Sequence, residues 1–197
     1  MRRPLLAVVV ALLTLTACGD DDVATELHGS QVDPPFTVAT TALVDTDGAS
    51  FSLTADTAER LTMVFFGYTS CPDICGRVLG NLSAAMTRLD EEDRGQVEVV
   101  FVTTDPARDT GEVVRDYLDR YDPSFVGVTG ELDDIAGVAA SVGVGMGEEL
   151  PTGGYEVDAH TTTVTGIDIG DEAPIFWSQE TSPSEYAEDI HTLLRED

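Results

Sequence analysis

Apolar and polar residues follow two different periods along the chain from residue 36 to the C-terminus. Leu61–Phe66 and Val97–Val102 are short, largely apolar runs, which is typical of strands that are buried on both faces of a sheet. Residues 78–89 instead carry their apolar side chains at helical spacing. Strands that alternate with amphipathic helices predict an α/β fold in which helices cover the faces of the sheet.

The order of the predicted elements narrows the fold further. The predicted strands are residues 36–44, 51–53, 61–66, 97–102, 125–128, 157–169 and 173–177. The predicted helices are residues 75–89, 109–118, 132–142 and 184–194. One hairpin, with its turn at Asp47-Gly48, opens this order, and a second hairpin followed by a helix closes it. The order predicts a thioredoxin-like fold, with a central mixed β-sheet flanked by helices and an N-terminal β-hairpin.

The first residues have the pattern of an export signal. Two arginines precede an apolar stretch, residues 5–15, that is too short to span a bilayer. Residues 15–18, Leu-Thr-Ala-Cys, then place small residues before a cysteine, and the segment resembles a bacterial lipoprotein signal peptide with its lipobox. That resemblance implies lipidation of Cys18 and attachment to the outer face of the cytoplasmic membrane. The alternative, an ordinary secretion signal, also takes the protein out of the cytoplasm.

Three segments follow from this pattern. Residues 1–17 are expected to be a lipoprotein signal peptide that is removed. Residues 18–35 contain three successive aspartates and few apolar side chains, so we expect a lipid-anchored, solvated tether. Residues 36–197 have the size of one domain with a single core.

The charge of the chain is strongly negative. Ten basic residues, all of them arginine, stand against 37 Asp and Glu, for a formal net charge of −27. Nucleic acid is therefore excluded as a partner, because binding to phosphates needs a cationic surface. A high-salt habitat or a genome rich in guanine and cytosine explains this composition better than a role in attracting metal cations, because net charge governs solubility and association.

Two further cysteines, Cys71 and Cys75, bound one short loop. The loop follows a predicted buried strand, and Cys75 falls in the first turn of the next helix, where amide groups and the helix dipole favour a thiolate. Because a lipidated Cys18 is unavailable, these two sulfurs can pair with each other, bind a metal together, or react. Three residues separate them, one more than in thioredoxin-type redox loops, which gives two soft ligands room to converge on a metal.

Histidine, a further type of metal ligand, occurs three times. His28 lies in the predicted tether and His191 on the outer part of the last predicted helix, so we expect both to be exposed. His160 comes just before a late strand that a thioredoxin-like sheet places beside the cysteine loop. It is therefore the candidate for a third metal ligand.

Three blocks of the chain resemble the Sco (synthesis of cytochrome c oxidase) family. They are residues 67–75 (Gly-Tyr-Thr-Ser-Cys-Pro-Asp-Ile-Cys), residues 104–110 (Thr-Asp-Pro-Ala-Arg-Asp-Thr) and residues 157–160 (Val-Asp-Ala-His) with Asp168 further on. The resemblance covers residue 36 to the C-terminus. It implies a thioredoxin-like fold that binds one copper ion through the two loop cysteines and the histidine. In this chain the implied ligands are Cys71, Cys75 and His160.

The same resemblance implies a function. The protein would be a membrane-anchored copper chaperone that carries Cu(I) or Cu(II) and assists assembly of the binuclear copper centre of cytochrome c oxidase. Its partners would be the copper-bearing oxidase subunit or another copper chaperone. Cys71 and Cys75 would also form a redox-active pair, because a disulfide between them abolishes copper binding. The alternative is a thiol–disulfide oxidoreductase that keeps the cysteines of an oxidase subunit reduced, which leaves enzymatic activity open.

Residues around the ligands have candidate supporting roles. Asp73 would contact the ligands or a partner, although an acidic residue that opens a helix is equally explained by the helix dipole. The chain departs from the family pattern at Gly76, where proline is common, and at Ala159, where aspartate often precedes the histidine. Asp158 is the candidate replacement as outer partner of the histidine ring.

The second block also carries charged residues. We expect Asp105, Arg108 and Asp109 to form a buried ion pair with a helix cap that holds the loop beside the metal site. This role is structural rather than chemical.

Overall fold

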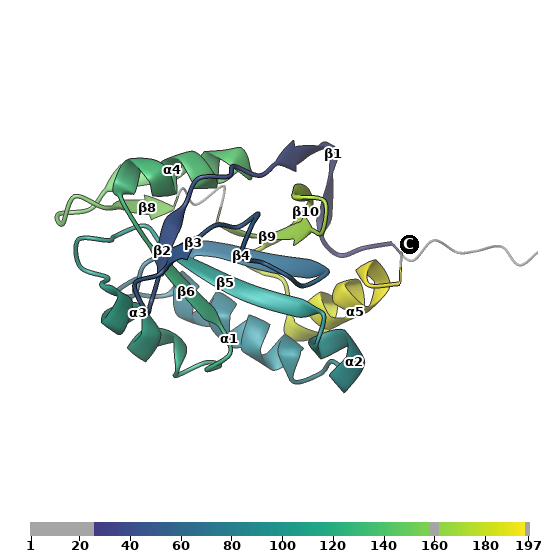
Figure 1. The fold of residues 1–197 in the computed structure, drawn as a ribbon. Helices are drawn as coiled ribbons and strands as arrows, with labels where there is room; N and C mark the ends of the chain where they lie inside the picture. Colours follow the sequence, from purple (N-terminus) through teal and green to yellow (C-terminus); the bar gives the residue numbers. More distant parts are fainter. Residues whose placement is uncertain (1–25, 158–161, 196–197) are drawn as a thin grey trace, which may run out of the picture.

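The computed structural model describes residues 26–157 and 162–195 (Figure 1). Its strands are β1 (Ser30–Thr37), β2 (Leu43–Asp45), β3 (Ser50–Phe51), β4 (Leu61–Gly67), β5 (Val97–Thr103), β6 (Val126–Thr129), β7 (Met146–Glu149), β8 (Tyr155–Val157), β9 (Thr163–Asp168) and β10 (Glu172–Ser178). Its helices are α1 (Ile74–Met86), α2 (Glu91–Arg94), α3 (Gly111–Leu118), α4 (Leu132–Ser141) and α5 (Pro183–Leu193).

An eight-stranded mixed sheet forms the centre of the molecule, in the order β1-β10-β9-β4-β5-β6-β2-β3. β4 and β5 pair in parallel, β5 and β6 do the same, and β9 runs antiparallel to β4. All of β4 and nearly all of β5 are buried, which explains why their sequences are almost continuously apolar. The predicted α/β class, with a mixed central sheet flanked by helices, is confirmed.

Helices cover both faces of this sheet (Figure 1). On one face, α1, α3 and α5 pack against side chains such as Met63, Phe65 and Phe101. On the other face, α4 packs against the side chains that alternate with these, such as Val64 and Phe66. The period of two along each strand therefore divides the apolar residues between two cores.

The N-terminal strand lies earlier in the chain than its sequence pattern predicts. In place of one strand over residues 36–44, β1 ends at Thr37 and β2 begins at Leu43. The break is necessary because β1 pairs with β10 near one edge of the sheet, whereas β2 pairs with β6 toward the other. The predicted hairpin is confirmed in β2 and β3, where Gly48 adopts a φ of +84° in the turn.

The expected tether, residues 18–35, overlaps the folded domain. Its last six residues, 30–35, belong to β1, where Ser30 lies opposite Phe176 and Gln31 opposite Ile175. This part of the prediction is wrong because β1 is held by backbone pairing along β10, and most of its side chains are exposed. A strand of this kind has no apolar period for a sequence pattern to detect.

Two further differences concern the second half of the chain and a short helix. The predicted strand 157–169 is two separate strands, because β8 pairs with β7 in a second small sheet, whereas β9 forms the predicted hairpin with β10. The short helix α2 was not predicted. Asp90 caps it by accepting a hydrogen bond from the backbone N–H of Asp93.

Candidate metal centre

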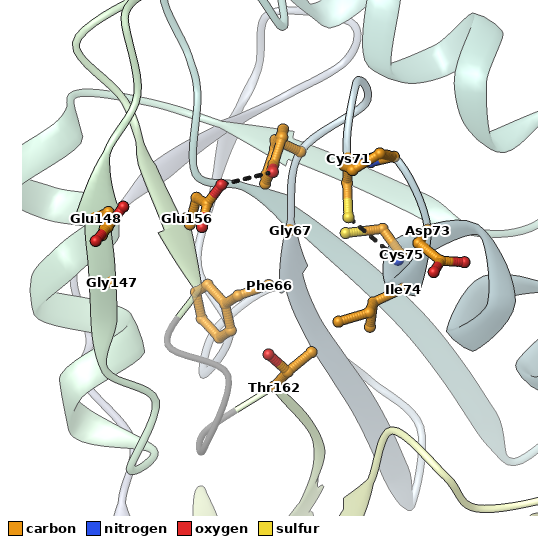
Figure 2. Close-up of a pocket in the computed structure, with 12 residues that line it drawn as sticks. Phe66, Gly67, Cys71, Asp73, Ile74, Cys75, Gly147, Glu148, Glu156 and Thr162 are labelled. Atoms are coloured by element: carbon orange, nitrogen blue, oxygen red, sulfur yellow. Dashed lines mark hydrogen bonds between the residues drawn. The ribbon is translucent and has the colours of Figure 1, made fainter.

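The two loop cysteines lie at the point where the central strand β4 gives way to α1 (Figure 2). Cys71 sits in a turn in which its N–H donates to the carbonyl of Tyr68 at 3.1 Å, and Cys75 lies in the first turn of the helix. Cys75 is buried and Cys71 is half-buried. The backbone N–H of Cys75 donates to Cys71 Sγ at 3.3 Å, and both are free thiols whose sulfur atoms lie beside each other (Figure 2).

The environment divides the protons unequally between the two sulfurs. A hydrogen bond from the Cys75 side chain lowers the pKa of Cys71 to about 6, and the amides of Asp73, Ile74 and Cys75 add to this effect against the opposing effect of burial. The same hydrogen bond and burial raise the pKa of Cys75. At neutral pH the pair is therefore a Cys71 thiolate that accepts a hydrogen bond from the Cys75 thiol.

A cavity of about 350 Å³ opens over the pair. It is lined by Phe66, Gly67, Tyr68, Cys71, Pro72, Asp73, Ile74, Cys75, Gly147, Glu148, Glu156 and Thr162. Glu148 and Glu156 come from the β7–β8 hairpin and lie across the cavity from the cysteine loop (Figure 2). The two thiol groups therefore line one side of the cavity, and the carboxylates of Glu148 and Glu156 line the opposite side.

Tyr68 joins these two sides of the cavity. Its hydroxyl donates to Glu156 Oε1 at 3.4 Å. Burial raises the pKa of Tyr68 to about 12, and the nearby Cys71 and Glu156 add to the shift. The hydroxyl thus keeps its proton at physiological pH and remains a hydrogen-bond donor beside the cysteines.

The third predicted ligand, His160, and its predicted partner Asp158 lie outside the described residues. Glu156 and Thr162, on either side of residues 158–161, both line the cavity over the cysteines. Among the described residues, the side chains form no group of three or more His, Cys, Asp or Glu placed to hold a metal ion.

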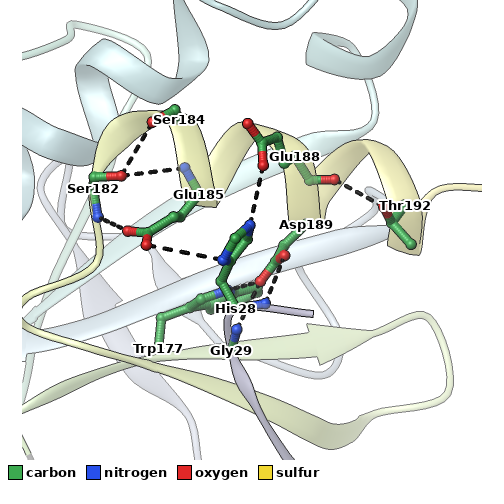
Figure 3. Close-up of polar contacts among 9 residues, drawn as sticks. All are labelled: His28, Gly29, Trp177, Ser182, Ser184, Glu185, Glu188, Asp189 and Thr192. Atoms are coloured by element: carbon green, nitrogen blue, oxygen red, sulfur yellow. Dashed lines mark hydrogen bonds and ion pairs between the residues drawn. The ribbon is translucent and has the colours of Figure 1, made fainter. Parts of the chain in front are cut away.

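The other two histidines are exposed, as expected, with His28 against α5 and His191 within it. Each is also paired with a carboxylate. His28 Nε2 lies 3.0 Å from Glu188 Oε2, and this contact raises the pKa of His28 (Figure 3). His191 Nδ1 lies 2.5 Å from Oδ2 of the buried Asp93. The sequence pattern missed both pairs because the partners come from remote segments.

The charged residues of the second block behave largely as predicted. Arg108 Nη2 lies 2.6 Å from Oδ2 of the fully buried Asp105, so the expected ion pair is present, but it is buried on the Asp105 side only because Arg108 is exposed. The cap of α3 is Thr110, whose side chain accepts from the N–H of Val113. Asp109 does not cap the helix: its Oδ1 lies 3.9 Å from Arg108 Nε, and its carboxylate accepts from Thr69 next to the cysteine loop.

Asp73 and Gly76 flank Cys75 at the start of α1. Asp73 occupies the N-cap position without a side-chain cap hydrogen bond, and its exposed side chain lies at the cavity. A Cβ at Gly76 would lie 2.9 Å from the hydroxyl oxygen of Tyr121. The glycine that departs from the family pattern therefore makes room for a tyrosine that packs against the first turn of the helix.

Several residues at the cavity were not found from the sequence. Tyr68 lies inside the first block of resemblance, which was a usable signal. Glu148 and Glu156 gave none, because only the pairing of β7 with β8 brings them opposite the cysteines. Thr162 gave none either.

Comparison with known proteins agrees with this geometry. The family model described as SCO1/SenC matches residues 26–195. The mitochondrial Protein SCO1 homolog of Homo sapiens is 30% identical over 160 residues, which cover 75% of this chain and 53% of that protein. The chain spans about half, or less, of the length of the curated relatives that it matches.

Solved structures show the same fold. The crystal structure of Arabidopsis thaliana ScoI with copper bound has a TM-score of 0.71 at 26% identity, and the match covers 82% of this chain and 99% of that one. Bradyrhizobium japonicum ScoI with copper bound has a TM-score of 0.67 at 29% identity, with 79% and 98% covered. The predicted thioredoxin-like fold is confirmed by these likenesses.

Proposed function

Because this chain belongs to the SCO1/SenC family, we propose that it is a membrane-anchored copper chaperone that assists assembly of the binuclear copper centre of cytochrome c oxidase. The observation that carries the proposal is the arrangement of Cys71 and Cys75, two adjacent sulfur atoms that line one cavity. The two ScoI structures with copper bound support the choice of metal. The partners in this proposal are the copper-bearing oxidase subunit or another copper chaperone.

The donor set that we propose for the copper is Cys71, Cys75 and His160. Two thiolates and an imidazole satisfy Cu(I) with three ligands and can hold Cu(II) when a further ligand joins. A structural zinc site would ordinarily have a fourth protein ligand. Because the raised pKa of Cys75 keeps its proton on in the metal-free protein, copper binding must release that proton.

The described residues support a role for the segment that contains His160. Glu156 and Thr162 line the same cavity as the two cysteines, and only five residues lie between them. A ligand from this segment has a short path to the sulfurs. We propose Asp158 as the outer hydrogen-bond partner of the imidazole.

We also propose the anchor. Residues 1–17 would be removed and Cys18 lipidated, so that the domain hangs on the outer face of the cytoplasmic membrane by the residues that precede β1. No helix in the described ranges is long and apolar enough to cross a membrane. The described N-terminal segment lies beside α5, at the far end of the molecule from β8 (Figure 1), the strand that contributes Glu156 to the cavity. A tether attached there leaves the cysteines free to face a partner.

The second candidate function is thiol–disulfide exchange. A half-buried Cys71 with a pKa lowered to about 6 next to a buried Cys75 with a raised pKa is the asymmetry of an attacking and a resolving thiol. In this function the protein would keep the cysteines of an oxidase subunit reduced.

Titration with Cu(I) tests the chaperone proposal. Reduced protein is titrated in competition with a chromophoric Cu(I) chelator, together with His160→Ala and with the matched control His191→Ala, whose ring is paired with Asp93 on α5. We expect one copper per protein, an affinity reduced at least about tenfold in His160→Ala, and no change in His191→Ala. Binding of no copper, or equal affinity in both variants, contradicts the proposal. Disulfide reduction that persists in His160→Ala without copper favours the second function.

A further inference from the structure

A buried carboxylate lies directly behind the cysteine loop. Asp109 is 0% exposed, and its Oδ2 accepts from the backbone N–H of Thr69 at 2.7 Å while its Oδ1 accepts from the Thr69 hydroxyl at 2.6 Å. Thr103 Oγ1 donates to the same Oδ2 at 2.8 Å. A buried carboxylate is costly to leave unpaired, and hydrogen bonds to a charged acceptor are the stronger kind. Thr69, two residues before Cys71, is therefore held firmly in place.

Thr104, in the segment between β5 and α3, forms hydrogen bonds to the ends of two strands that border the cavity. The N–H of Thr104 donates to the carbonyl of Gly67 at 2.7 Å, at the end of β4. On its other side, Thr104 Oγ1 donates to the carbonyl of Tyr155 at 2.6 Å and its own carbonyl accepts from the Tyr155 N–H at 2.9 Å. Gly154 permits this approach, because a Cβ there would lie 2.6 Å from the Thr104 carbonyl oxygen. Thr104 thus ties β8 to the strand that leads into the cysteine loop.

We propose that Asp109 is a positioning residue that sets the reduction potential and copper affinity of the Cys71–Cys75 pair through its grip on Thr69. We use the word bracket for the pair Thr69–Asp109 together with Thr104, which bonds separately to Gly67 and Tyr155. The proposal shares one assumption with the proposed function, namely that Cys71 and Cys75 act together as a redox and metal-binding pair. It adds residues that are not themselves predicted ligands.

The physical reason is preorganisation. A loop held by the bracket keeps the two sulfurs at a high effective concentration, which favours any reaction that joins them. In exchange with glutathione disulfide, Cys71 and Cys75 lose two electrons and two protons and form one S–S bond. The S–S bond of glutathione disulfide breaks, and its two sulfurs take up those electrons and protons to give two glutathione thiols. A loosened loop lowers the equilibrium constant of this exchange, and it lowers copper chelation for the same reason.

The test compares two threonines on the same carboxylate. Thr69→Val removes the hydroxyl that belongs to the cysteine loop, whereas Thr103→Val removes the hydroxyl that belongs to β5. Equilibrium with glutathione buffers, in the absence of copper, is measured by alkylation and mass spectrometry. We expect Thr69→Val to lower the equilibrium constant about tenfold, or ~30 mV for a two-electron couple. We expect Thr103→Val to lower stability to urea while the equilibrium constant stays within about twofold.

Two more variants, Thr69→Ser and Asp109→Asn, separate the effect of the hydrogen bonds from a general effect of substitution at these positions. Thr69→Ser keeps the donor hydroxyl and is expected to match the wild type. Asp109→Asn loses the charge and turns one acceptor oxygen into an NH2 group that faces a donor, so it should lower the equilibrium constant at least as far as Thr69→Val. The proposal is overturned if Thr69→Val leaves the equilibrium constant within twofold, or if Thr103→Val or Thr69→Ser shifts it equally. A wild type that binds no copper, with the Thr69→Val shift still present, rejects the chaperone function and supports the bracket.

Discussion

At the scale of single residues, Cys71 and Cys75 differ in exposure and in pKa, and both differences favour reaction at Cys71 first. The pKa of Cys71 is lowered to about 6 and that of Cys75 is raised. Iodoacetamide should therefore modify Cys71 first in the reduced, metal-free protein, with a rate that rises through a midpoint at about pH 6. Peptide mass spectrometry across pH 4–9 measures this. A midpoint near the ordinary thiol value, about 8.5, or preferential modification of Cys75, would contradict it.

The same shift predicts a dependence of stability on pH. Because folding lowers the pKa of Cys71, the thiolate stabilises the folded protein fully above the unfolded value of about 8.5, and this contribution is lost as the pH falls through about 6. The difference in free energy of unfolding between reduced wild type and Cys71→Ser should shrink over that range. Urea denaturation at pH 8.5, 7 and 5.5 measures it. A difference that is constant or grows at low pH would refute the assignment.

Another buried carboxylate, Asp189, secures the N-terminal segment to α5 (Figure 3). It is 2% exposed and accepts from the backbone N–H groups of His28 and Gly29 and from Trp177 Nε1, at 3.0, 2.8 and 2.7 Å. Asp189→Ala leaves three donors without their acceptor and should cost roughly 2–4 kcal/mol of unfolding free energy. Fluorescence of Trp177, the single tryptophan, reports the urea transition.

The exposed Glu188 on the same helix is the control for this prediction. Its pair with His28 lies at the surface, so Glu188→Ala should change the free energy of unfolding by less than about 1 kcal/mol. Equal costs in the two variants would show that Asp189 does not have the role that its three hydrogen bonds indicate.

At the scale of elements, the β7–β8 hairpin depends on one glycine. Gly154 leaves no space for a side chain, since a Cβ would lie 2.6 Å from both Asp105 Cα and the Thr104 carbonyl oxygen. Gly154→Ala should therefore push β8 away from Thr104, at a cost of about 1–3 kcal/mol, and should weaken copper binding. Denaturation and Cu(I) competition measure the two effects.

Gly137 is the matched control, because a Cβ at this exposed position in α4 meets nothing within 4 Å. Gly137→Ala should stabilise the protein by about 0.5–1 kcal/mol, because alanine loses less backbone entropy in a helix. A destabilising Gly137→Ala, or a neutral Gly154→Ala, would mean that the backbone positions are not as described.

Elements also differ in how far the sequence predicted them. The sequence predicted β4, β5, α1 and α4, because buried strands and amphipathic helices have a recognisable local pattern of apolar residues. β1 and β7 were missed because backbone pairing holds them, and much of their side-chain surface is exposed. The length of such a strand depends on the strand it pairs with. The local sequence pattern contains no information about that partner strand.

At the scale of the whole molecule, a net charge of −27 should destabilise the compact state at low salt. Raising NaCl from 10 to 200 mM shortens the screening length from about 30 Å to less than 10 Å and should raise Tm. For a domain of this size, each 1 kcal/mol gained corresponds to about 2–4 °C. Calorimetry measures the shift. If Tm rises only above molar salt, ion exclusion rather than charge screening is the cause.

The alternation of strands and helices and the place of Cys71 and Cys75 at the start of a helix could be predicted from the sequence, because both depend on spacing between neighbouring residues. The surroundings of the two sulfurs could not, because they come from parts of the chain that meet only on folding. The contact between Thr69 and Asp109 joins residues 40 positions apart, and that between Tyr68 and Glu156 joins residues 88 apart. Such contacts depend on the order and register of the paired strands. That order and register result from interactions among many segments of the chain.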